Sequence, residues 1–489
     1  YLTSYKIRSL HVFWHNDTTI IIRDENPERK GMGAKQRIYT AGVLYYTVLE
    51  IRTDFQKGRQ EDVMERNDPR YQAYVEILKE ELIPAMGCTE PIALAYAAAK
   101  AREVLGVLPD SVQLQVSGSI IKNVKSVIVP NTGHLKGMEA AVAAGIIAGS
   151  AEKELEVISE VSEEKKSAIR DYLQTVPITI EHTEQGHVFD IVVTERCGQD
   201  YARVRIADYH TNICRIEKNG TVLYEVPLLD ETVQEDARAD RSLLNMQDIW
   251  DFAETADLRD VADLLERQIR YNNAIAEEGL LGDYGANIGR VLLTTYGNDV
   301  SNRAKAKAAA GSDARMNGCE LPVIINSGSG NQGITCSVPL IEYAKELHSG
   351  KEKLYRALII SNLVAIHEKT GIGTLSAYCG AVSAGAGAGA GIVYLCGDGY
   401  QAAIHTVVNA LAIVSGIVCD GAKASCAAKI ASSVDAALLG YNMYKCNQEF
   451  KGGDGIVMKD IETTIKGIGR LGKDGMRQTN EEIIRLMMS

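Results

Sequence analysis

Residues 370–419 read TGIGTLSAYCGAVSAGAGAGAGIVYLCGDGYQAAIHTVVNALAIVSGIVC. The only charged residue in this stretch is Asp398, and the uncharged run on each side of it reaches the length of a membrane span. The composition does not suit lipid, because glycine alternates with alanine and serine, and such small residues favour close approach between helix backbones. We therefore predict a helical hairpin that is buried in a globular core and does not cross a membrane.

The composition of the whole chain is typical of a globular protein. Its 489 residues are 46% hydrophobic and 24% charged, which excludes a disordered or fibrous chain. The net charge of −12 argues against nucleic acid or an anionic membrane as a partner, since both require a basic surface. Ten cysteines are too few for a disulfide scaffold, and the first residues lack the pattern of a signal peptide. We expect a cytoplasmic protein with free thiols.

The periodicity of apolar residues divides the chain into parts. A helical face begins at Tyr71 and stops before Pro84, and we expect residues 64–110 to form helices that complete a large helical domain. Residues 111–230 combine helices with strand-like runs, including Asn219-Gly220 between alternating apolar residues, a strong hairpin signal. Residues 231–489 are helical almost throughout. The predicted fold class is α+β: a large, mostly helical domain and a smaller α+β domain with an antiparallel sheet.

Residues 1–63 differ from the rest of the chain. They show no sustained amphipathic period, and a helix begins only after Met64. Two interpretations stay open: an accessory or disordered arm, or an artefactual extension ahead of a true start at Met64.

Cys88 lies in the sequence PAMGCTEP, residues 84–91. Thr89 suits an N-cap position, and Glu90 and Pro91 suit a first helical turn, so Cys88 is expected just before a helix N-terminus. The partial positive charge there favours a thiolate, whereas Glu90 opposes it. A reactive thiol and a small buried side chain are both compatible with this pattern.

Three further cysteines fall in or next to the uncharged stretch: Cys379, Cys419 and Cys426. In one continuous helix, the Cα atoms of Cys419 and Cys426 would lie about 10.5 Å apart, which is long for two ligands of one centre. Asp420 as an N-cap and Gly421 as a turn would shorten the distance and direct a helix N-terminus toward an anionic cluster. Six other cysteines are predicted to be small buried hydrophobic residues: Cys197, Cys214, Cys319, Cys336, Cys396 and Cys446.

A glycine-rich loop, SGSGNQG at 327–333, follows an apolar run. Its backbone N–H groups can bind an anion, either a substrate carboxylate or a cofactor phosphate. It is not a P-loop, because the Gly-Lys-Ser/Thr ending is absent. A similar loop occurs in pyridoxal-phosphate dehydratases, and a purely structural turn is also compatible.

Four motifs occur in a fixed order: MGCTEPIALAYAAA (86–99), SGSGNQGIT (327–335), HEKTGIGTLSAYCGAVSAGAGAGAG (367–391) and CDGAKASCAAKIASSVDAA (419–437). Together they closely resemble the L-cysteine desulfidase family, relatives of the iron–sulfur L-serine dehydratases. The resemblance extends from Tyr71 to the C-terminus. One motif of the bacterial serine dehydratases, Ser-Ser-His-Thr, is missing, which favours the desulfidase branch and leaves serine open as a substrate.

The resemblance implies a [4Fe-4S] cluster bound by Cys379, Cys419 and Cys426, with one iron open to substrate. It implies Cys88 as the base that removes the α-proton, and it places Asn123, Ser329 and Asn331 near the substrate. The expected reaction is β-elimination of L-cysteine to pyruvate, ammonia and sulfide. Such a reaction needs a base and a Lewis acid for the leaving group. The expected partners are a small amino-acid substrate and further copies of the chain, without nucleic acid or membrane.

Two alternatives remain beside this interpretation. A pyridoxal-phosphate lyase would need a Schiff-base lysine, for which Lys369 and Lys423 are available. In a non-enzymatic protein the hairpin would pack on a partner and the cysteines would be inert.

Overall fold

The computed structural model describes residues 64–183, 187–228, 239–373 and 375–488, together with four strands within the first 63 residues. Those strands form an antiparallel sheet in the order β1 (Ser4–Ile7), β2 (Leu10–His15), β3 (Thr19–Asp24) and β4 (Arg37–Thr40). Residues 1–63 and 64–489 are two separate compact units. The other residues of 1–63 lie outside the described residues, so the two interpretations of that segment stay predictions.

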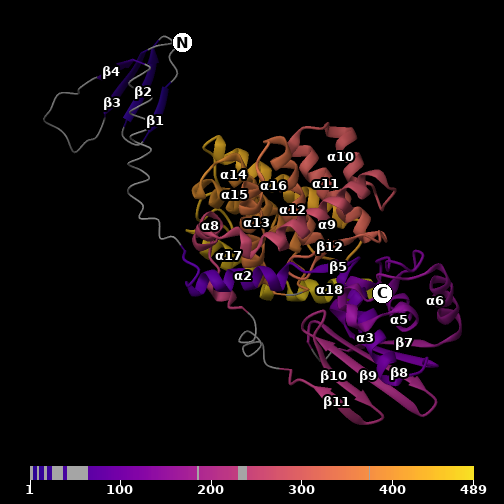
Figure 1. The fold of residues 1–489 in the computed structure, drawn as a ribbon. Coiled ribbons are helices and arrows are strands. Elements are labelled where there is room, and N and C mark those ends of the chain that lie inside the picture. Colours follow the sequence, from indigo (N-terminus) through magenta and orange to yellow (C-terminus); the bar gives the residue numbers. More distant parts are fainter. Residues whose placement is uncertain are drawn as a thin grey trace. The chain divides into compact units, whose positions relative to one another are not determined.

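Within residues 64–489, most of the chain folds into a helical part (Figure 1). Its α-helices are α2 (Pro69–Glu81), α8 (Met246–Thr255), α9 (Ala262–Leu281), α10 (Ile288–Tyr296), α11 (Val300–Met316), α12 (Gly330–Glu346), α13 (Lys351–Ile372), α14 (Gly380–Cys396), α15 (Tyr400–Val414), α16 (Cys426–Lys445), α17 (Ile461–Arg470) and α18 (Arg477–Met488). Shorter turns are η4 (Arg241–Leu243), η5 (Leu258–Asp260) and η6 (Leu471–Gly475).

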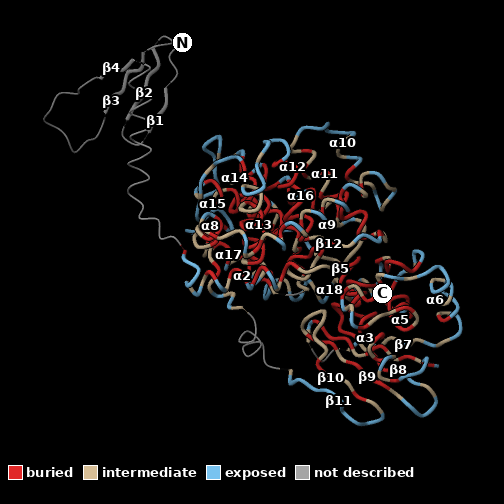
Figure 2. The backbone as a smooth tube through the Cα atoms, viewed as in Figure 1, coloured by how far each residue is buried: buried red, intermediate tan, exposed pale blue. Residues whose placement is uncertain are grey.

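The predicted hairpin is formed by α14 and α15. α14 is buried along nearly its whole length (Figure 2) and packs against α12, α13, α15 and α16. Its glycines allow close packing: a Cβ on Gly387 would lie 2.4 Å from the backbone oxygen of Ser361 on α13. A Cβ on Gly385 would lie 2.8 Å from Ser433 on α16. Among the described residues, none of the helices combines the length and the apolar composition that crossing a membrane would require.

The smaller part contains a six-stranded sheet in the order β11-β10-β9-β8-β6-β7. The strands are β6 (Ser111–Ser117), β7 (Ile178–Thr183), β8 (Asp190–Cys197), β9 (Asp200–Ala207), β10 (Ile213–Lys218) and β11 (Thr221–Glu225). Asn219 and Gly220 both have positive φ angles and join β10 to β11, as the hairpin signal predicted. The α+β class is thus confirmed.

One pair in this sheet differs from the expected antiparallel arrangement, because β6 and β7 are parallel. A long connection separates them: α4 (Gly118–Val124), α5 (Gly137–Ala148), η2 (Ala151–Glu156) and α6 (Glu163–Thr175). A crossover of this length returns the chain to the end of the sheet where β6 began, and parallel pairing requires such a connection.

The helix α3 (Thr89–Leu105) also differs from expectation. Residues 64–110 were expected to complete the helical domain, but α3 packs against β8, β9 and α5 and so covers the sheet. The reason is its Ala-rich surface: a Cβ on Gly145 of α5 would lie 2.2 Å from the backbone oxygen of Ala95, so α3 and α5 pack with their backbones in close approach.

The two parts are joined at a short antiparallel ladder of β5 (Pro84–Met86) and β12 (Pro322–Ile324). Asn272 completes the free edge of β12, since its side chain accepts from Ile324 N at 2.8 Å and donates to Ile324 O at 3.1 Å. This ladder brings the chain before Cys88 next to the chain before the glycine-rich loop.

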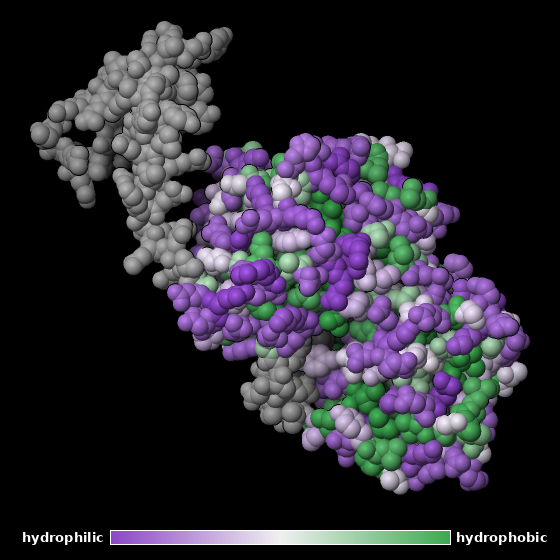
Figure 3. Space-filling view, viewed as in Figure 1, coloured by the Kyte–Doolittle hydropathy of each residue, from purple (hydrophilic) through white to green (hydrophobic). Residues whose placement is uncertain are grey.

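The face drawn in Figure 3 is mainly hydrophilic over the helical part, while apolar residues gather over the sheet. The edge strand β11 contributes to the apolar surface with Val222, Leu223 and Tyr224, which are all exposed.

Candidate active site

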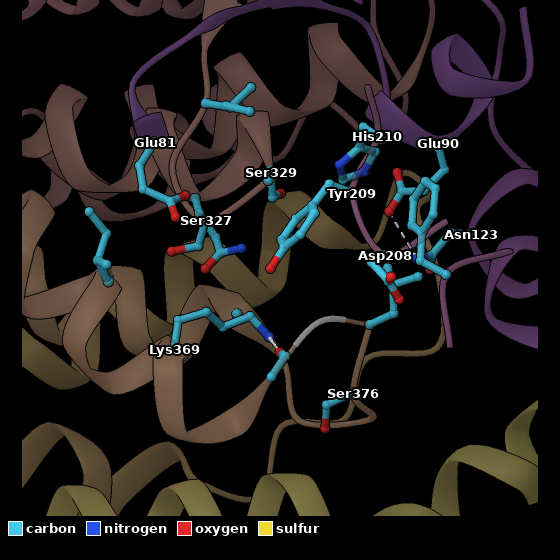
Figure 4. Close-up of a pocket in the computed structure, with 18 of the residues that line it drawn as sticks. Glu81, Glu90, Asn123, Asp208, Tyr209, His210, Ser327, Ser329, Lys369 and Ser376 are labelled. Atoms are coloured by element: carbon cyan, nitrogen blue, oxygen red, sulfur yellow. Dashed lines mark hydrogen bonds between the residues drawn. The ribbon is translucent and has the colours of Figure 1, made fainter. Parts of the chain in front are cut away.

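All seven residues that the sequence singled out line one cavity of about 980 Å³: Cys88, Asn123, Ser329, Asn331, Cys379, Cys419 and Cys426. Figure 4 shows that its walls come from distant segments, with Glu90 and Asn123 on one side and Lys369 and Ser376 on another. Tyr209 and His210 enter from the turn between β9 and β10. The cavity is therefore assembled by the fold and not by one contiguous motif.

Cys88 belongs to a hydrogen-bonded group at the start of α3. Its Sγ donates to Glu90 Oε2 at 3.0 Å, and Asn123 Nδ2 donates to Glu90 Oε1 at 3.0 Å (Figure 4). Cys88 and Glu90 are 2% and 8% exposed. Thr89 was expected to be the N-cap, but the N-cap residue is Cys88, because the Thr89 hydroxyl donates to Gly328 O at 3.0 Å and so ties α3 to the glycine-rich loop.

The surroundings of Cys88 favour the thiol form. Burial raises the pKa of Cys88 well above its usual value, the charge of Glu90 raises it further, and Arg315 opposes both effects. The helix N-terminus alone was expected to favour a thiolate, and the structure shows that burial and Glu90 outweigh it. Cys88 therefore rests as a hydrogen-bond donor to a carboxylate that can accept its proton.

The other three cysteines converge from two chain segments. Tyr378 and Val418 form an antiparallel bridge, flanked by hydrogen bonds from Cys379 N to Ile417 O (3.1 Å) and from Cys419 N to Ala377 O (2.6 Å). Cys379 is the N-cap of α14, and Cys419 lies one residue beyond the bridge on the paired segment.

Cys426 completes this set as the first residue of α16. Asp420 was expected to be an N-cap, but the N-cap of α16 is Ser425, and Asp420 instead pairs with Lys423 and Lys429. Burial, together with Cys419 and Cys426, raises the pKa of Cys379 to about 12. Because Cys419 and Cys426 oppose the ionisation of Cys379, the three thiols can ionise together only where positive charge compensates them.

Two lysines, the buried Lys122 and the half-buried Lys369, supply positive charge beside the three thiols. Lys122 donates to Asn480 Oδ1 at 2.6 Å, and Lys369 donates to Gly373 O. Neither forms an ion pair with a carboxylate among the described residues. Burial lowers the pKa of Lys122, and it lowers that of Lys369 to about 8, while Cys419 raises both. A buried unpaired cation is costly, so these lysines fit an anionic group held between them and the cysteines.

The arrangement differs from a site for a single metal ion. Within the described parts of the chain, no three His, Cys, Asp or Glu side chains converge on one ion. The thiolates of an iron–sulfur cluster bind separate irons, so their sulfurs lie further apart than the ligands of one ion. The three cavity-lining thiols and the two lysines beside them fit such a cluster in both donor type and charge.

The glycine-rich loop has the expected strand–turn–helix form. Ser327 and Gly328 have positive φ angles of 48° and 74°, and Asn326 and Ser329 exchange backbone hydrogen bonds of 3.1 and 3.0 Å across this tight turn. Ser329 is the N-cap of α12 but forms no side-chain cap hydrogen bond, and Asn331 lies in the first turn of the helix. The N-terminus of α12 therefore faces the cavity without a capping side chain.

Several cavity residues were missed by the sequence analysis. Arg315, His210 and Gln332 line the cavity, and each has buried polar atoms without a hydrogen-bond partner in the described structure. Arg315 and Gln332 are buried, and His210 is half-buried. Burial lowers the pKa of His210, which favours the neutral imidazole. A signal existed for Arg315, because a charged residue at the end of the run AKAAAGSDAR is unusual on a helix face made of small apolar residues.

The remaining cysteines agree only in part with the prediction that they are buried. Cys214, Cys319 and Cys336 are buried, whereas Cys396 and Cys446 are exposed and Cys197 is intermediate. Cys396 and Cys446 are the last residue of α14 and the residue after α16, where the helices reach the surface. All ten cysteines are free.

Comparisons with known proteins show what this chain is similar to. Residues 152–485 match the family model described as serine dehydratase alpha chain. The chain is 61% identical over 426 residues to a UPF0597 protein of Desulfitobacterium hafniense, covering 87% of this chain and 99% of that protein. It is 52% identical over 419 residues to a UPF0597 protein of Lachnoclostridium phytofermentans (86% and 100%) and 46% identical over 430 residues to one of Treponema denticola (87% and 100%).

Proposed function

This chain belongs to the serine dehydratase alpha-chain family, and we propose that it is an iron–sulfur lyase that eliminates the β-substituent of L-cysteine to give pyruvate, ammonia and sulfide. The observation that carries the proposal is that Cys88, Cys379, Cys419 and Cys426 line the same cavity. The family is of the iron–sulfur dehydratase type, which supports a lyase with such a cluster. L-Serine is the second candidate substrate, favoured by the family's description.

In this proposal Cys379, Cys419 and Cys426 hold a [4Fe-4S] cluster. When bound, the cluster supplies a Lewis acid that stabilises the negative charge developing on the departing β-substituent. The protein contributes the three thiols and the two lysines Lys122 and Lys369, whose positive charges favour the ionised thiols.

Cys88 removes the α-proton. Its own proton first moves to Glu90 Oε2 along the existing 3.0 Å hydrogen bond, and the resulting thiolate then accepts the proton from the substrate's α-carbon. Asn123 holds the carboxylate of Glu90 in place through its 3.0 Å hydrogen bond. The electron pair left on the α-carbon forms the double bond as the β-substituent leaves, and the aminoacrylate product hydrolyses to pyruvate and ammonia.

The pyridoxal-phosphate alternative is supported less well. Lys369 does line the cavity, but Lys423 is paired with Asp420, and the family is of the iron–sulfur type. A non-enzymatic role leaves the buried hydrogen-bonded group of Cys88, Glu90 and Asn123 without an explanation.

The test is iron and acid-labile sulfide analysis of protein purified without oxygen, with pyruvate formation measured from L-cysteine and from L-serine. Cys426→Ser should lose most of the iron and the broad visible absorbance. Cys396→Ser is the matched control, because Cys396 lies at the opposite end of α14 from Cys379, about 25 Å along the helix. Equal iron content in the two variants, or full activity in iron-free protein, would exclude the proposal.

A further inference from the structure

Arg315 is the last charged residue of α11, and its side chain is 2% exposed. Its Nε and Nη2 atoms have no hydrogen-bond partner within the described structure, and it forms no ion pair there. An unpaired guanidinium in a protein interior is costly, and arginine remains charged at any physiological pH. Because Arg315 lines the cavity, the counter-charge that it lacks can come from a bound anion.

A second feature of the same wall also favours an anion. A Cβ on Gly330 would lie 2.3 Å from Arg315 Nε, so the missing side chain at this position lets the guanidinium lie against the first turn of α12. This helix has 17 residues, and Ser329 does not cap it with its side chain. The partial positive charge of the helix N-terminus therefore adds to the charge of Arg315.

Beside these donors, the same turn carries unpaired acceptors. Asn331 Oδ1 and Gln332 Oε1 are buried and have no hydrogen-bond partner within the described residues. Gln332 extends toward the cluster cysteines, since a Cβ on Gly380, the residue after Cys379, would lie 2.6 Å from Gln332 Cδ. Unpaired amide oxygens match a ligand group that only donates hydrogen bonds, such as an ammonium.

From these observations we propose that the wall formed by Arg315, Asn331 and Gln332 binds the zwitterionic head of a free α-amino acid. The guanidinium of Arg315 binds the α-carboxylate in a bidentate manner, and the two amide oxygens accept hydrogen bonds from the α-ammonium. This assignment rests on the proposed function for the reaction that follows binding, but the binding itself does not depend on turnover.

The charges around the wall disfavour the other anion that the loop suggested, a cofactor phosphate. A phosphate carries up to two negative charges, but Arg315 is the only cation of this wall, and the carboxylate of Glu90 and two amide oxygens lie nearby in the cavity. A monocarboxylate with an adjacent ammonium satisfies both sets of unpaired atoms at once.

The position of the wall also suits the reaction. Arg315 lowers the pKa of Cys88 through its charge, so it lies close enough to influence the base, while Gln332 lies against Gly380, the residue after Cys379. An amino acid held by its head on this wall has its α-carbon between Cys88 and the three cluster cysteines.

The test compares the binding of L-alanine and L-alaninamide by calorimetry to the cluster-loaded protein and to its Arg315→Met variant. L-Alanine has the full zwitterionic head but no β-leaving group, so it cannot turn over, and the amide lacks the carboxylate charge. The wild-type protein should bind L-alanine at least ~10-fold more tightly than the amide, as expected for a hydrogen bond to a charged group. In Arg315→Met the ratio of the affinity for L-alanine to the affinity for the amide should fall to about 1.

Arg303→Met is the matched control, because Arg303 lies on the same helix but pairs with Glu342 and Glu346 away from the cavity. It should keep the preference for L-alanine. Damage to the fold would lower the affinity for L-alanine and for L-alaninamide together. The ratio of the two affinities therefore separates recognition of the carboxylate from a structural role of Arg315.

The inference is overturned if wild-type protein binds the two ligands equally or binds neither, or if Arg315→Met keeps the preference. These outcomes are distinct from failure of the proposed function. A protein that forms no pyruvate from L-cysteine or L-serine, yet prefers L-alanine through Arg315, would refute the lyase and retain the amino-acid site. A protein that forms pyruvate but shows no preference for L-alanine that depends on Arg315 would retain the lyase and refute the amino-acid site.

Discussion

Replacing Glu90 with glutamine tests whether the carboxylate takes the proton of Cys88. The substitution keeps the size of the side chain, and the new amide oxygen can still accept from Asn123 Nδ2. The other carboxylate oxygen, which accepts from Cys88 Sγ at 3.0 Å and from Thr89 Oγ1 at 3.1 Å, becomes an NH2 group. The variant therefore turns the acceptor facing the thiol into a donor.

The size of the effect follows from the role assigned to this pair. A positioned base contributes about 10²–10⁴-fold to a rate, which corresponds to roughly 3–5 kcal/mol of transition-state stabilisation. Glu90→Gln removes the acceptor for the Cys88 proton, and it also removes the negative charge that raises the pKa of Cys88. If the thiolate forms by proton transfer to Glu90, loss of the acceptor dominates, and the variant should lose most of that factor in kcat. The cost to folding is that of one or two altered buried hydrogen bonds, about 1–3 kcal/mol, so the variant should remain folded.

The assay is pyruvate formation from L-cysteine by anaerobically purified protein, normalised to iron content. Glu103→Gln is the control, because Glu103 lies on the same helix but is exposed and paired with Lys100. Exposed pairs of this kind contribute little, so the control should match the wild-type protein in both rate and iron.

Two results would refute the reasoning. If Glu90→Gln keeps a rate within a few-fold of wild type at equal iron content, Cys88 loses its proton by another route or is not the base. If exchange of the substrate's α-proton with deuterated solvent continues at the wild-type rate in the variant, Glu90 acts after proton removal and not before it.

Three further predictions concern the base and the fold. Cys88→Ala should keep a full complement of iron and lose at least ~10²-fold in turnover and in α-proton exchange; loss of iron would instead make Cys88 a ligand. Gly387→Ala should lower the unfolding midpoint in urea, because its Cβ would lie 2.4 Å from Ser361 O, whereas Gly399→Ala, with open space around it, should change little. Burial raises the pKa of Asp313 to about 6, so the charged form destabilises the fold; the stability gained by Asp313→Asn at pH 7 should shrink as the pH falls from 6 toward 4.

Much of the fold was predictable because its signals are local. The Asn219-Gly220 turn, the helix over Pro69–Glu81 and the strand–turn–helix around Ser327 each depend on the conformational preferences of a few neighbouring residues. The parallel pairing of β6 with β7 was not predictable in this way. It depends on where a connection of about sixty residues returns the chain, and strand periodicity carries no information about direction.

The first residues of the helices also show that local preferences do not predict tertiary contacts. Thr89 and Asp420 are good N-cap residues by type, but each side chain has a better partner elsewhere: Gly328 O for Thr89, and two lysines for Asp420. Capping preferences describe an isolated helix, and in both places a tertiary contact at the cavity outweighs a contribution of about 1 kcal/mol.

The candidate site also contains residues that local sequence signals reveal and residues that only the folded structure reveals. Its cysteines, its loop and Lys369 could be found because they lie in long motifs, whereas Arg315 and Lys122 are single charges outside those motifs, and their roles depend on what surrounds them. Lys122 and Arg315 are buried and Lys369 is half-buried, and none of the three forms an ion pair in the described structure, although most buried charges in proteins are paired. Arg315 and Lys369 line the cavity that also holds four thiols, and Lys122 packs against Gly421, another lining residue. A fold that keeps three cations unpaired gives up stability in the empty state, and it regains that stability when anionic groups bind. The anionic cluster then compensates the charges of the two lysines, and the substrate carboxylate compensates the charge of Arg315. The free energy lost by leaving these cations unpaired therefore makes the site selective for the cluster and the amino acid.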